Sequence, residues 1–310
     1  MDRLEKIPVP LLPTIAGALT LSNVYGGLGY VWIRHFFMWS AVVVLVAYII
    51  KMIRFPKTCL NEYMQVVPCS LYAGFSMIVM ILGSYFYEMG WGFGKPMWAI
   101  GIIIHAGQIL VFTYMNVIRQ RNIDTFIPSW FATYNGILVG CVVGGIMNEA
   151  DKLKYIVFYG IAIYAIIVPL MVWRLIKFEV KPAMYHAQAV ILAPCSLCVV
   201  GIINITPWMP APILYILYGC VILSLLFVVY LLPKAFSYDF YPGYAGITFP
   251  MAIGIVATNK FAGYLAEHGQ EALSKMLTQL GGIQIYLTTM IIGYVLLKFC
   301  FPDRLFKKES

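Results

Sequence analysis

Two histidines in the apolar part of this chain could accept and release protons. His105 and Gln108 lie in a run of isoleucine and alanine, and His186 and Gln188 lie close to a basic stretch. A titratable group at membrane depth is usual in proton relays and ion-coupling sites. A lone histidine without a charged neighbour is more often hydrogen-bonded to an adjacent helix. We therefore interpret His105 as structural and His186 as solvated near the membrane surface.

No second group of reactive residues accompanies the histidines. Cys195 and Cys198 form a C-x-x-C pair, but a metal or redox site would need further ligands. The sequence has no G-x-x-x-x-G-K-[ST] phosphate-binding motif. Asp, Glu, Lys and Arg fall only at the ends of the apolar runs. We therefore predict no catalytic residues, no cofactor and no metal, and we do not expect an enzyme.

The composition indicates that these residues lie in a membrane. Of 310 residues, 62% are hydrophobic and 11% are charged, and the mean hydropathy is +0.84. A membrane helix needs about 20 mostly apolar residues. We predict an all-α integral membrane protein of ten transmembrane helices, with residues 1–310 as a single domain. The predicted spans are 7–26, 36–50, 63–87, 96–118, 125–148, 155–173, two within 182–233 that separate near 206–212, 240–259 and 276–297.

Five prolines recur in alternate spans. Their spacings of 55, 60, 66 and 56 residues predict five helical hairpins with one such proline each. A proline inside a helix removes a backbone hydrogen bond and frees a carbonyl. Membrane helices tolerate that change where protein or water lies alongside. The prolines that we expect to kink or line an inner, wet surface are Pro13, Pro68, Pro128, Pro194 and Pro250.

The odd-numbered spans differ from the even-numbered spans in composition. The odd spans carry hydroxyl residues such as Thr133 and Thr248 and glycines such as Gly17, whereas the even spans are mainly Val, Ile, Leu, Phe and Tyr. Small and polar residues are typical of helix contacts and water-lined surfaces. We therefore predict that the odd helices lie inside and the even helices face lipid. The alternative is that the small residues only permit tight packing, with no conduit.

The distribution of basic residues predicts the orientation. With ten spans both termini share one side, and 15 of the 21 lysines and arginines fall there. The positive-inside rule then places both termini in the cytoplasm. The net charge of +8 is thereby explained by topology, so we expect no nucleic-acid partner. The mixed stretch 260–279 is predicted as an outer loop with a short interfacial helix.

One short motif in the ninth span is distinctive. Thr248-Phe249-Pro250-Met251 places a bulky ring directly before a helix-breaking proline. This motif resembles the family of tellurite-resistance and C4-dicarboxylate transporters, which includes the plant guard-cell slow anion channels and the fungal malate permeases. Residues 189–194 and 128–140 are similar to the family's seventh and fifth helices. Residues 16–23 have fewer glycines than the corresponding helix of relatives.

The resemblance implies a specific architecture. Members of the family have five helical hairpins around a quasi-fivefold axis, with odd helices inside and even helices outside. They assemble as homotrimers with a separate central pore in each protomer. By the motif match, Phe249 is the ring that occludes the pore. The alternative for Phe249 is a ring that is packed between helices or faces lipid.

The predicted function is a gated anion channel or facilitator of the plasma membrane that passes small monovalent anions such as chloride and nitrate. Without fixed charge at pore depth, an anion would be held weakly by freed backbone groups, by hydroxyls such as Thr133 and Thr248, and by the basic cytoplasmic face. One alternative is a carrier for malate, another C4-dicarboxylate or tellurite, for which His105 is the titratable candidate. A further alternative is a membrane scaffold or sensor with a vestigial pore. The expected partners are small anions, the lipid bilayer and two further copies of the chain.

Overall fold

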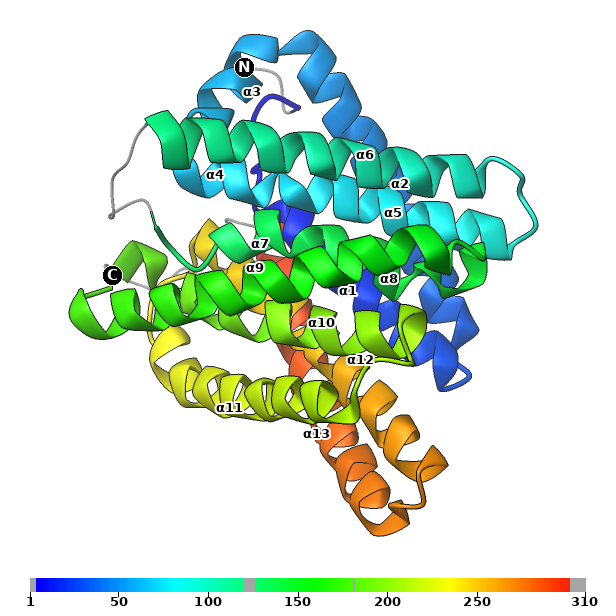
Figure 1. The fold of residues 1–310 in the computed structure, drawn as a ribbon. Coiled ribbons are helices and arrows are strands. Elements are labelled where there is room, and N and C mark those ends of the chain that lie inside the picture. Colours follow the sequence, from blue (N-terminus) through cyan, green and yellow to red (C-terminus); the bar gives the residue numbers. More distant parts are fainter. Residues whose placement is uncertain (1–3, 120–125, 181, 302–310) are drawn as a thin grey trace.

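The computed structural model describes residues 4–119, 126–180 and 182–301, in which all regular elements are helices and there is no strand (Figure 1). Seven helical stretches in this part of the chain are long and apolar enough to cross a membrane. They coincide with seven of the ten predicted spans. They are α2 (Val31–Arg54), Val66–Glu88 with α4 (Val66–Leu71) and α5 (Ala73–Glu88), Gly94–Arg119 with α6 (Gly94–Phe112), α9 (Ala150–Lys177), Met184–Ile205 with α10 (Leu192–Ile205), α11 (Ala211–Ala235) and α13 (Glu271–Cys300).

The first, fifth and ninth predicted spans have a different form. Helix α1 (Leu11–Gly27) has 17 residues, and α12 (Ala245–Glu267) contains Pro250. The fifth span is broken into α7 (Trp130–Tyr134), a 3-10 turn at Gly136–Leu138, α8 (Val139–Val142) and a second 3-10 turn at Gly144–Met147; its first residue, Thr125, lies outside the described residues. The seven long apolar helices establish a multi-pass helical membrane protein.

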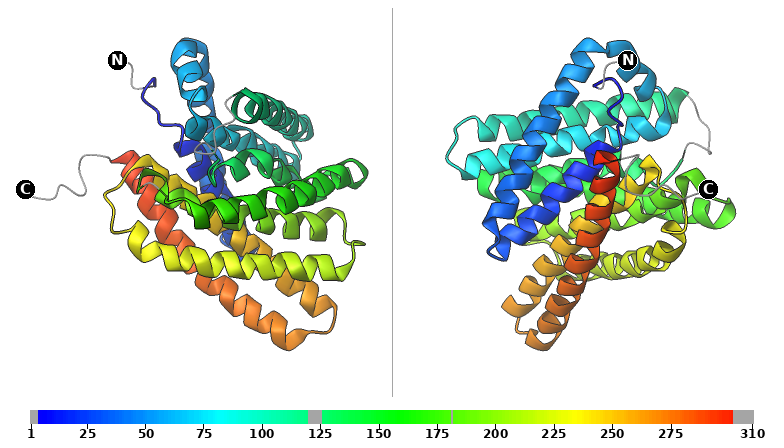
Figure 2. Two further views of the ribbon diagram at one scale, coloured as in Figure 1. Left: turned by 60° about the vertical axis from the view of Figure 1, so that its left-hand side comes forward. Right: turned by 180° about the vertical axis from the view of Figure 1, so that it is seen from behind.

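The prediction of an outer loop with a short interfacial helix at 260–279 is wrong. Helix α12 continues to Glu267 and α13 begins at Glu271, with Gly269 at φ 76° in the turn between them. The helices extend because this part of the chain is packed: Phe261 and Leu265 are buried, and the Phe261 ring stacks on Tyr218 of α11. The tip of this hairpin projects beyond the rest of the bundle (Figures 1 and 2).

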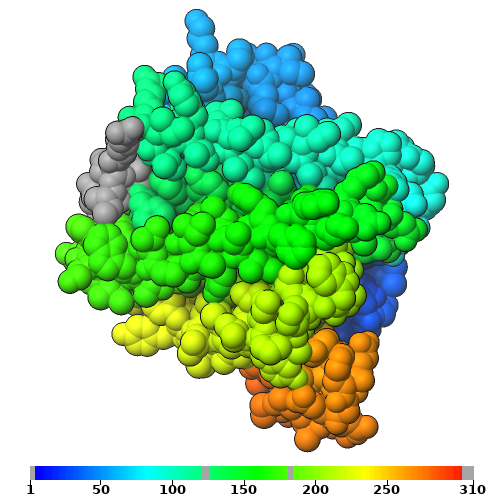
Figure 3. All heavy atoms as spheres, viewed as in Figure 1, coloured from blue at the N-terminus to red at the C-terminus, as the bar shows by residue number. Residues whose placement is uncertain are grey.

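Burial separates the helices of the odd-numbered predicted spans from the helices of the even-numbered spans. The share of buried residues is 78% in the apolar stretch of Val66–Glu88 and 83% in that of Met184–Ile205. It is 28% to 33% in α2, in α6 with the π-helix Thr113–Arg119 that follows it, and in α9, α11 and α13. Figure 3 shows side chains of α6, α9 and α11 forming a continuous surface on one face. The predicted division into inner and outer helices is thus present.

The inner elements contact one another in a series. Helix α1 packs against α5 and α12, and α5 packs against α8. The α8 segment packs against α10, and α10 packs against α12. Each outer helix lies on its hairpin partner, as α2 lies on α1 and α13 lies on α12.

Side-chain hydrogen bonds define two ends of the bundle. At the Glu88 end, Ser84 Oγ donates to the Val143 carbonyl at 2.9 Å, and Asn204 Nδ2 donates to the Val142 carbonyl at 2.8 Å. These two bonds hold the C-terminal ends of α5, α8 and α10 together. At the opposite end, which we call the Lys51 end, the Lys51 ammonium donates to the Ile7 carbonyl at 2.8 Å. Helices α1 and α13 are in contact, and the start of α1 and the end of α13 lie close together in the right-hand view of Figure 2.

A charged cluster joins α6 to α9 at the Glu88 end. Glu149 directly precedes α9, and its carboxylate accepts from Lys152 at 2.8 Å and from Lys95 at 2.7 Å. These two ammonium groups lower the pKa of Glu149 to about 2. The carboxylate therefore stays charged at any physiological pH.

Candidate functional site

Phe249 lies in α12 where that helix touches α1. A methyl group added at Gly17 would be 2.8 Å from the Phe249 nitrogen and 2.9 Å from the Thr248 carbonyl carbon. The absence of a side chain at Gly17 therefore lets the two backbones meet. The Phe249 residue is 6% exposed, so its ring is held among neighbouring helices and does not face lipid.

A cavity of about 200 Å³ lies against Phe249. Its walls come from α1, α5, the 139–146 segment and α12, which correspond to the first, third, fifth and ninth predicted spans. Phe249 is the lining residue nearest the start of α12, and Glu88 is the lining residue at the end of α5. The residues that line this cavity are Thr20, Asn23, Ile81, Ser84, Glu88, Val139, Val142, Val143, Ile146, Phe249, Ile253 and Val256.

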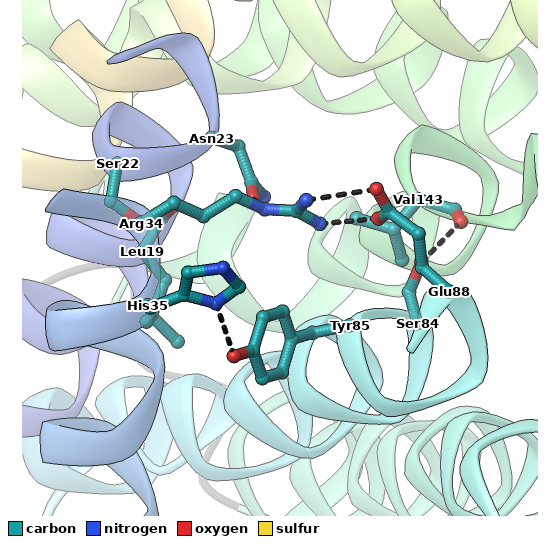
Figure 4. A network of polar contacts seen from close by, with 9 residues as sticks. All are labelled: Leu19, Ser22, Asn23, Arg34, His35, Ser84, Tyr85, Glu88 and Val143. Atoms are coloured by element: carbon teal, nitrogen blue, oxygen red, sulfur yellow. Dashed lines mark hydrogen bonds and ion pairs between the residues drawn. The ribbon is translucent and has the colours of Figure 1, made fainter. Parts of the chain in front are cut away.

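An ion pair forms the rim of this cavity at the Glu88 end (Figure 4). Arg34, near the start of α2, donates from Nη1 to Glu88 Oε1 at 2.9 Å, and its Nη2 pairs with Oε2. Arg34 Nε also donates to Asn23 Oδ1 at 2.8 Å. Because the contact is bidentate, the carboxylate that lines the cavity is neutralised by one guanidinium. The nearby His35 Nδ1 lies 2.6 Å from the Tyr85 hydroxyl.

The two hydroxyl groups that line the cavity are bonded to the backbone, and the Asn23 amide oxygen and the Glu88 carboxylate accept from Arg34. Thr20 Oγ1 donates to the Ala16 carbonyl at 2.9 Å, and Ser84 Oγ donates to Val143. The remaining wall is mostly valine and isoleucine. An ion in this cavity would meet no strong ligand, so the cavity is suited to passage more than to capture.

The two threonines predicted to line a pore differ in the hydrogen bonds of their hydroxyl groups. Thr248 Oγ1 lies 2.8 Å from the Ala245 carbonyl and 3.5 Å from the Pro13 carbonyl, so its hydrogen is used by the backbone. Thr133 Oγ1 is buried and has no partner among the described residues. Neither threonine lines the cavity at Phe249.

The five prolines lie at helix starts more often than in helix interiors. Pro250 lies inside α12, whereas Pro128 precedes α7. The first four N–H groups of an α-helix have no partner within it, so a proline there removes no bond of that helix. The prolines in this position, each the third residue of its helix, are Pro13 in α1, Pro68 in α4 and Pro194 in α10.

His105 is a structural link, as its sequence setting indicated. The residue is fully buried, with Nδ1 2.7 Å from Ser76 Oγ and Nε2 2.8 Å from the Thr133 carbonyl. It therefore ties α6 to α5 and to the broken fifth span. Gln108 adds a bond from Nε2 to the Cys69 carbonyl at 3.1 Å.

The interpretation of His186 as a solvated residue is wrong. It is 1% exposed, its Nε2 lies 2.9 Å from the Ala235 carbonyl, and its Nδ1 pairs with the Tyr241 hydroxyl. The Tyr244 ring covers it with centroids 3.9 Å apart. Because Tyr241 and Tyr244 enclose it, the His186 ring is shielded from water although it lies near the end of the bundle.

Sequence reasoning missed the Arg34–Glu88 pair at the rim. The two residues are 54 positions apart, and each stands at the end of an apolar run. Charges at span ends are ordinary in membrane proteins. The one available signal was that both ends fall on the same predicted side of the membrane.

The contact at Gly17 leads to a first prediction. Gly17→Ala is expected to lower the thermal unfolding temperature in detergent, because the methyl group would press on backbone atoms of Phe249 and Thr248 that cannot rotate away. Overpacking of this kind costs about 1–3 kcal/mol. Gly263→Ala is the matched control, since a methyl group there meets nothing within 4 Å. Equal unfolding temperatures for the two variants would show that the helices separate freely here.

Comparison with known protein families gives a match over nearly the whole chain. The family model described as voltage-dependent anion channel matches residues 14–300. The chain belongs to this family. Comparison with individually curated proteins finds no match.

Membership of the voltage-dependent anion channel family confirms the resemblance that the ninth-span motif indicated. The matched region runs from α1 to the end of α13 and includes Phe249, Arg34 and Glu88. Members of the family are channels and transporters, which supports anion transport in general for this chain.

Proposed function

We propose that this chain is a gated anion channel or facilitator whose conduit lies inside each protomer and is occluded by Phe249. The cavity of about 200 Å³ against the Phe249 ring carries this proposal. It is lined by inner elements alone and extends from Phe249 to Glu88. Phe249 lies where the cavity reaches the close backbone contact between α1 and α12 at Gly17.

We further propose ten spans, arranged as five hairpins about a quasi-fivefold axis. The contacts from α1 through α5, α8, α10 and α12 back to α1 support a closed ring of inner elements. At 1.5 Å per residue, the 17 residues of α1 span about 26 Å, close to the hydrocarbon thickness. A broken helix such as the fifth is tolerated at membrane depth only where protein or water covers its backbone. An inner position would provide that cover.

The charges near the cavity favour small monovalent anions over dicarboxylates. A dicarboxylate site needs at least two positive or strongly donating groups. Here Arg34 is already neutralised by Glu88, and the Thr20 and Ser84 hydrogens are engaged. An anion that sheds water easily, such as nitrate, would pass this wall more readily than a strongly hydrated divalent ion.

Reconstitution into liposomes tests the function. We expect chloride and nitrate to cross down their gradients without saturation at low concentration and without a requirement for a proton gradient. Empty liposomes and liposomes that contain an unrelated membrane protein are the controls. Saturable, proton-dependent uptake of malate or tellurite with no chloride flux would favour the carrier.

We also propose that both termini are cytoplasmic and that the protein lies in the plasma membrane as a homotrimer. The native Cys300 at the end of α13 is exposed, and Gln270 is an exposed residue in the turn between α12 and α13. In intact cells, a membrane-impermeant maleimide is expected to label Gln270→Cys and to leave Cys300 unlabelled until the cells are opened. Labelling of Cys300 from outside would reverse the orientation.

A further inference from the structure

Arg174 is a buried charge that has no counter-ion among the residues that the structure describes. It lies in the last turn of α9 at the Lys51 end and is 7% exposed. Its Nε is buried and has no hydrogen-bond partner among the described residues. None of the ion pairs in the described part of the chain includes it. An uncompensated buried charge is costly, so such a group is expected to meet an anion.

A second cavity lies at this guanidinium. It has a volume of about 140 Å³ and is lined by Arg174, Pro128, Ile127, Phe178, Glu179 and Met184, among others. The Arg174 Cζ is 5.8 Å from the centre of the Phe178 ring, which holds the guanidinium at the wall. This cavity shares no lining residue with the cavity at Phe249.

Among the described residues that line this cavity, Glu179 has the one carboxylate. Glu179 is exposed, and no ion pair joins it to Arg174 in the structure. The carbonyls at the C-terminus of α9 offset part of the Arg174 charge but leave its Nε unbonded. The described lining of the cavity therefore has one guanidinium without an ion-pair partner and one exposed negative group.

We propose that this cavity binds a small monovalent oxyanion, with Arg174 as its ligand. A guanidinium presents two parallel N–H groups that match two oxygens of a planar oxyanion. Ile127, Pro128 and Met184 provide an apolar wall that suits a weakly hydrated ion. Glu179 repels a second negative charge, so nitrate fits this site and sulfate or phosphate does not. The site stands apart from the proposed conduit and does not depend on it.

Thermal unfolding and isothermal titration of the purified protein in detergent test this site, with sodium nitrate as the probe and sodium sulfate for comparison. We expect nitrate to raise the unfolding temperature in a saturable way. Arg174→Gln is expected to weaken nitrate binding by roughly tenfold or more, because a charged hydrogen bond is lost. Lys177→Gln, which removes the same charge from the same helix outside this cavity, is expected to leave binding unchanged. Phe249→Ala is expected to leave it unchanged as well.

Glu179→Gln separates this proposal from its main alternative, in which Glu179 itself pairs with Arg174. If the cavity binds an anion, Glu179→Gln tightens nitrate binding and does not lower the unfolding temperature in nitrate-free buffer. If Glu179 is the partner, the same change lowers that temperature, and nitrate has no effect on the wild type. An equal response to sulfate, or an unchanged nitrate response in a folded Arg174→Gln protein, would also overturn the proposal.

Discussion

Phe249→Ala is expected to raise anion conductance on the order of tenfold or more, in a protein that still folds. The ring lies at the inner limit of a cavity lined by α1, α5, the 139–146 segment and α12. In the proposed function the ring is an apolar constriction that excludes water and ions, so its removal is expected to leave a gap. Currents in planar bilayers or oocytes, measured beside size-exclusion profiles in detergent, check this prediction.

Phe261→Ala is the matched control for that experiment. Phe261 lies in the same helix, is 2% exposed, and stacks on the Tyr218 ring at 4.0 Å between centroids. It does not line the cavity at Phe249. Its truncation is expected to cost about 3–5 kcal/mol of stability without any gain of current. If Phe249→Ala behaves in the same way, its ring is packed core and the gate lies elsewhere.

The rim of the cavity gives a second prediction, in which two substitutions act in opposite directions. Arg34→Gln leaves the Glu88 carboxylate uncompensated and is expected to lower anion flux severalfold at low salt, because negative charge at a pore mouth repels the permeant ion. Glu88→Gln leaves the Arg34 guanidinium and is expected to raise flux. Both effects are expected to shrink at high salt, where the Debye length falls to about 3 Å. Flux assays at two ionic strengths check them.

The double variant Arg34→Gln with Glu88→Gln is the control for this pair. It removes both charges and is expected to restore flux close to that of the wild type. If all three variants lose flux together and show lower unfolding temperatures, the ion pair is a structural clamp between α2 and α5. In that case its charge does not influence permeation.

The parts of the fold that follow from hydrophobicity could be predicted from the sequence. Seven of the ten spans appear as long apolar helices, and the alternation of buried and exposed helices follows the placement of residues such as Thr133 and Gly17. The broken form of the fifth span could not be predicted, because composition does not distinguish one long helix from several short turns. The extension of α12 to Glu267 was missed because charged residues on one face hid the buried Phe261 and Leu265.

The candidate site was only partly predictable, because some of its features are local in sequence and others join distant residues. Phe249 was found because its motif is local and precedes a proline. The cavity beside it, the Arg34–Glu88 rim and the burial of His186 depend on residues far apart in sequence. The contact between Thr248 Oγ1 and the Pro13 carbonyl joins residues that are 235 positions apart, and no local sequence pattern indicates it.

The contact between α1 and α12 has a consequence for how the chain is made. Thr248 and Phe249 meet Pro13 and Gly17 across nearly the whole sequence, and Tyr25 meets Thr289 at 2.8 Å across 264 positions. Helix α1 therefore leaves the ribosome long before its neighbour exists. Contacts at such separation form late and leave polar surface uncovered meanwhile. Chains truncated before residue 245 should consequently be held by insertion chaperones or degraded, whereas chains that end after α12 should escape both.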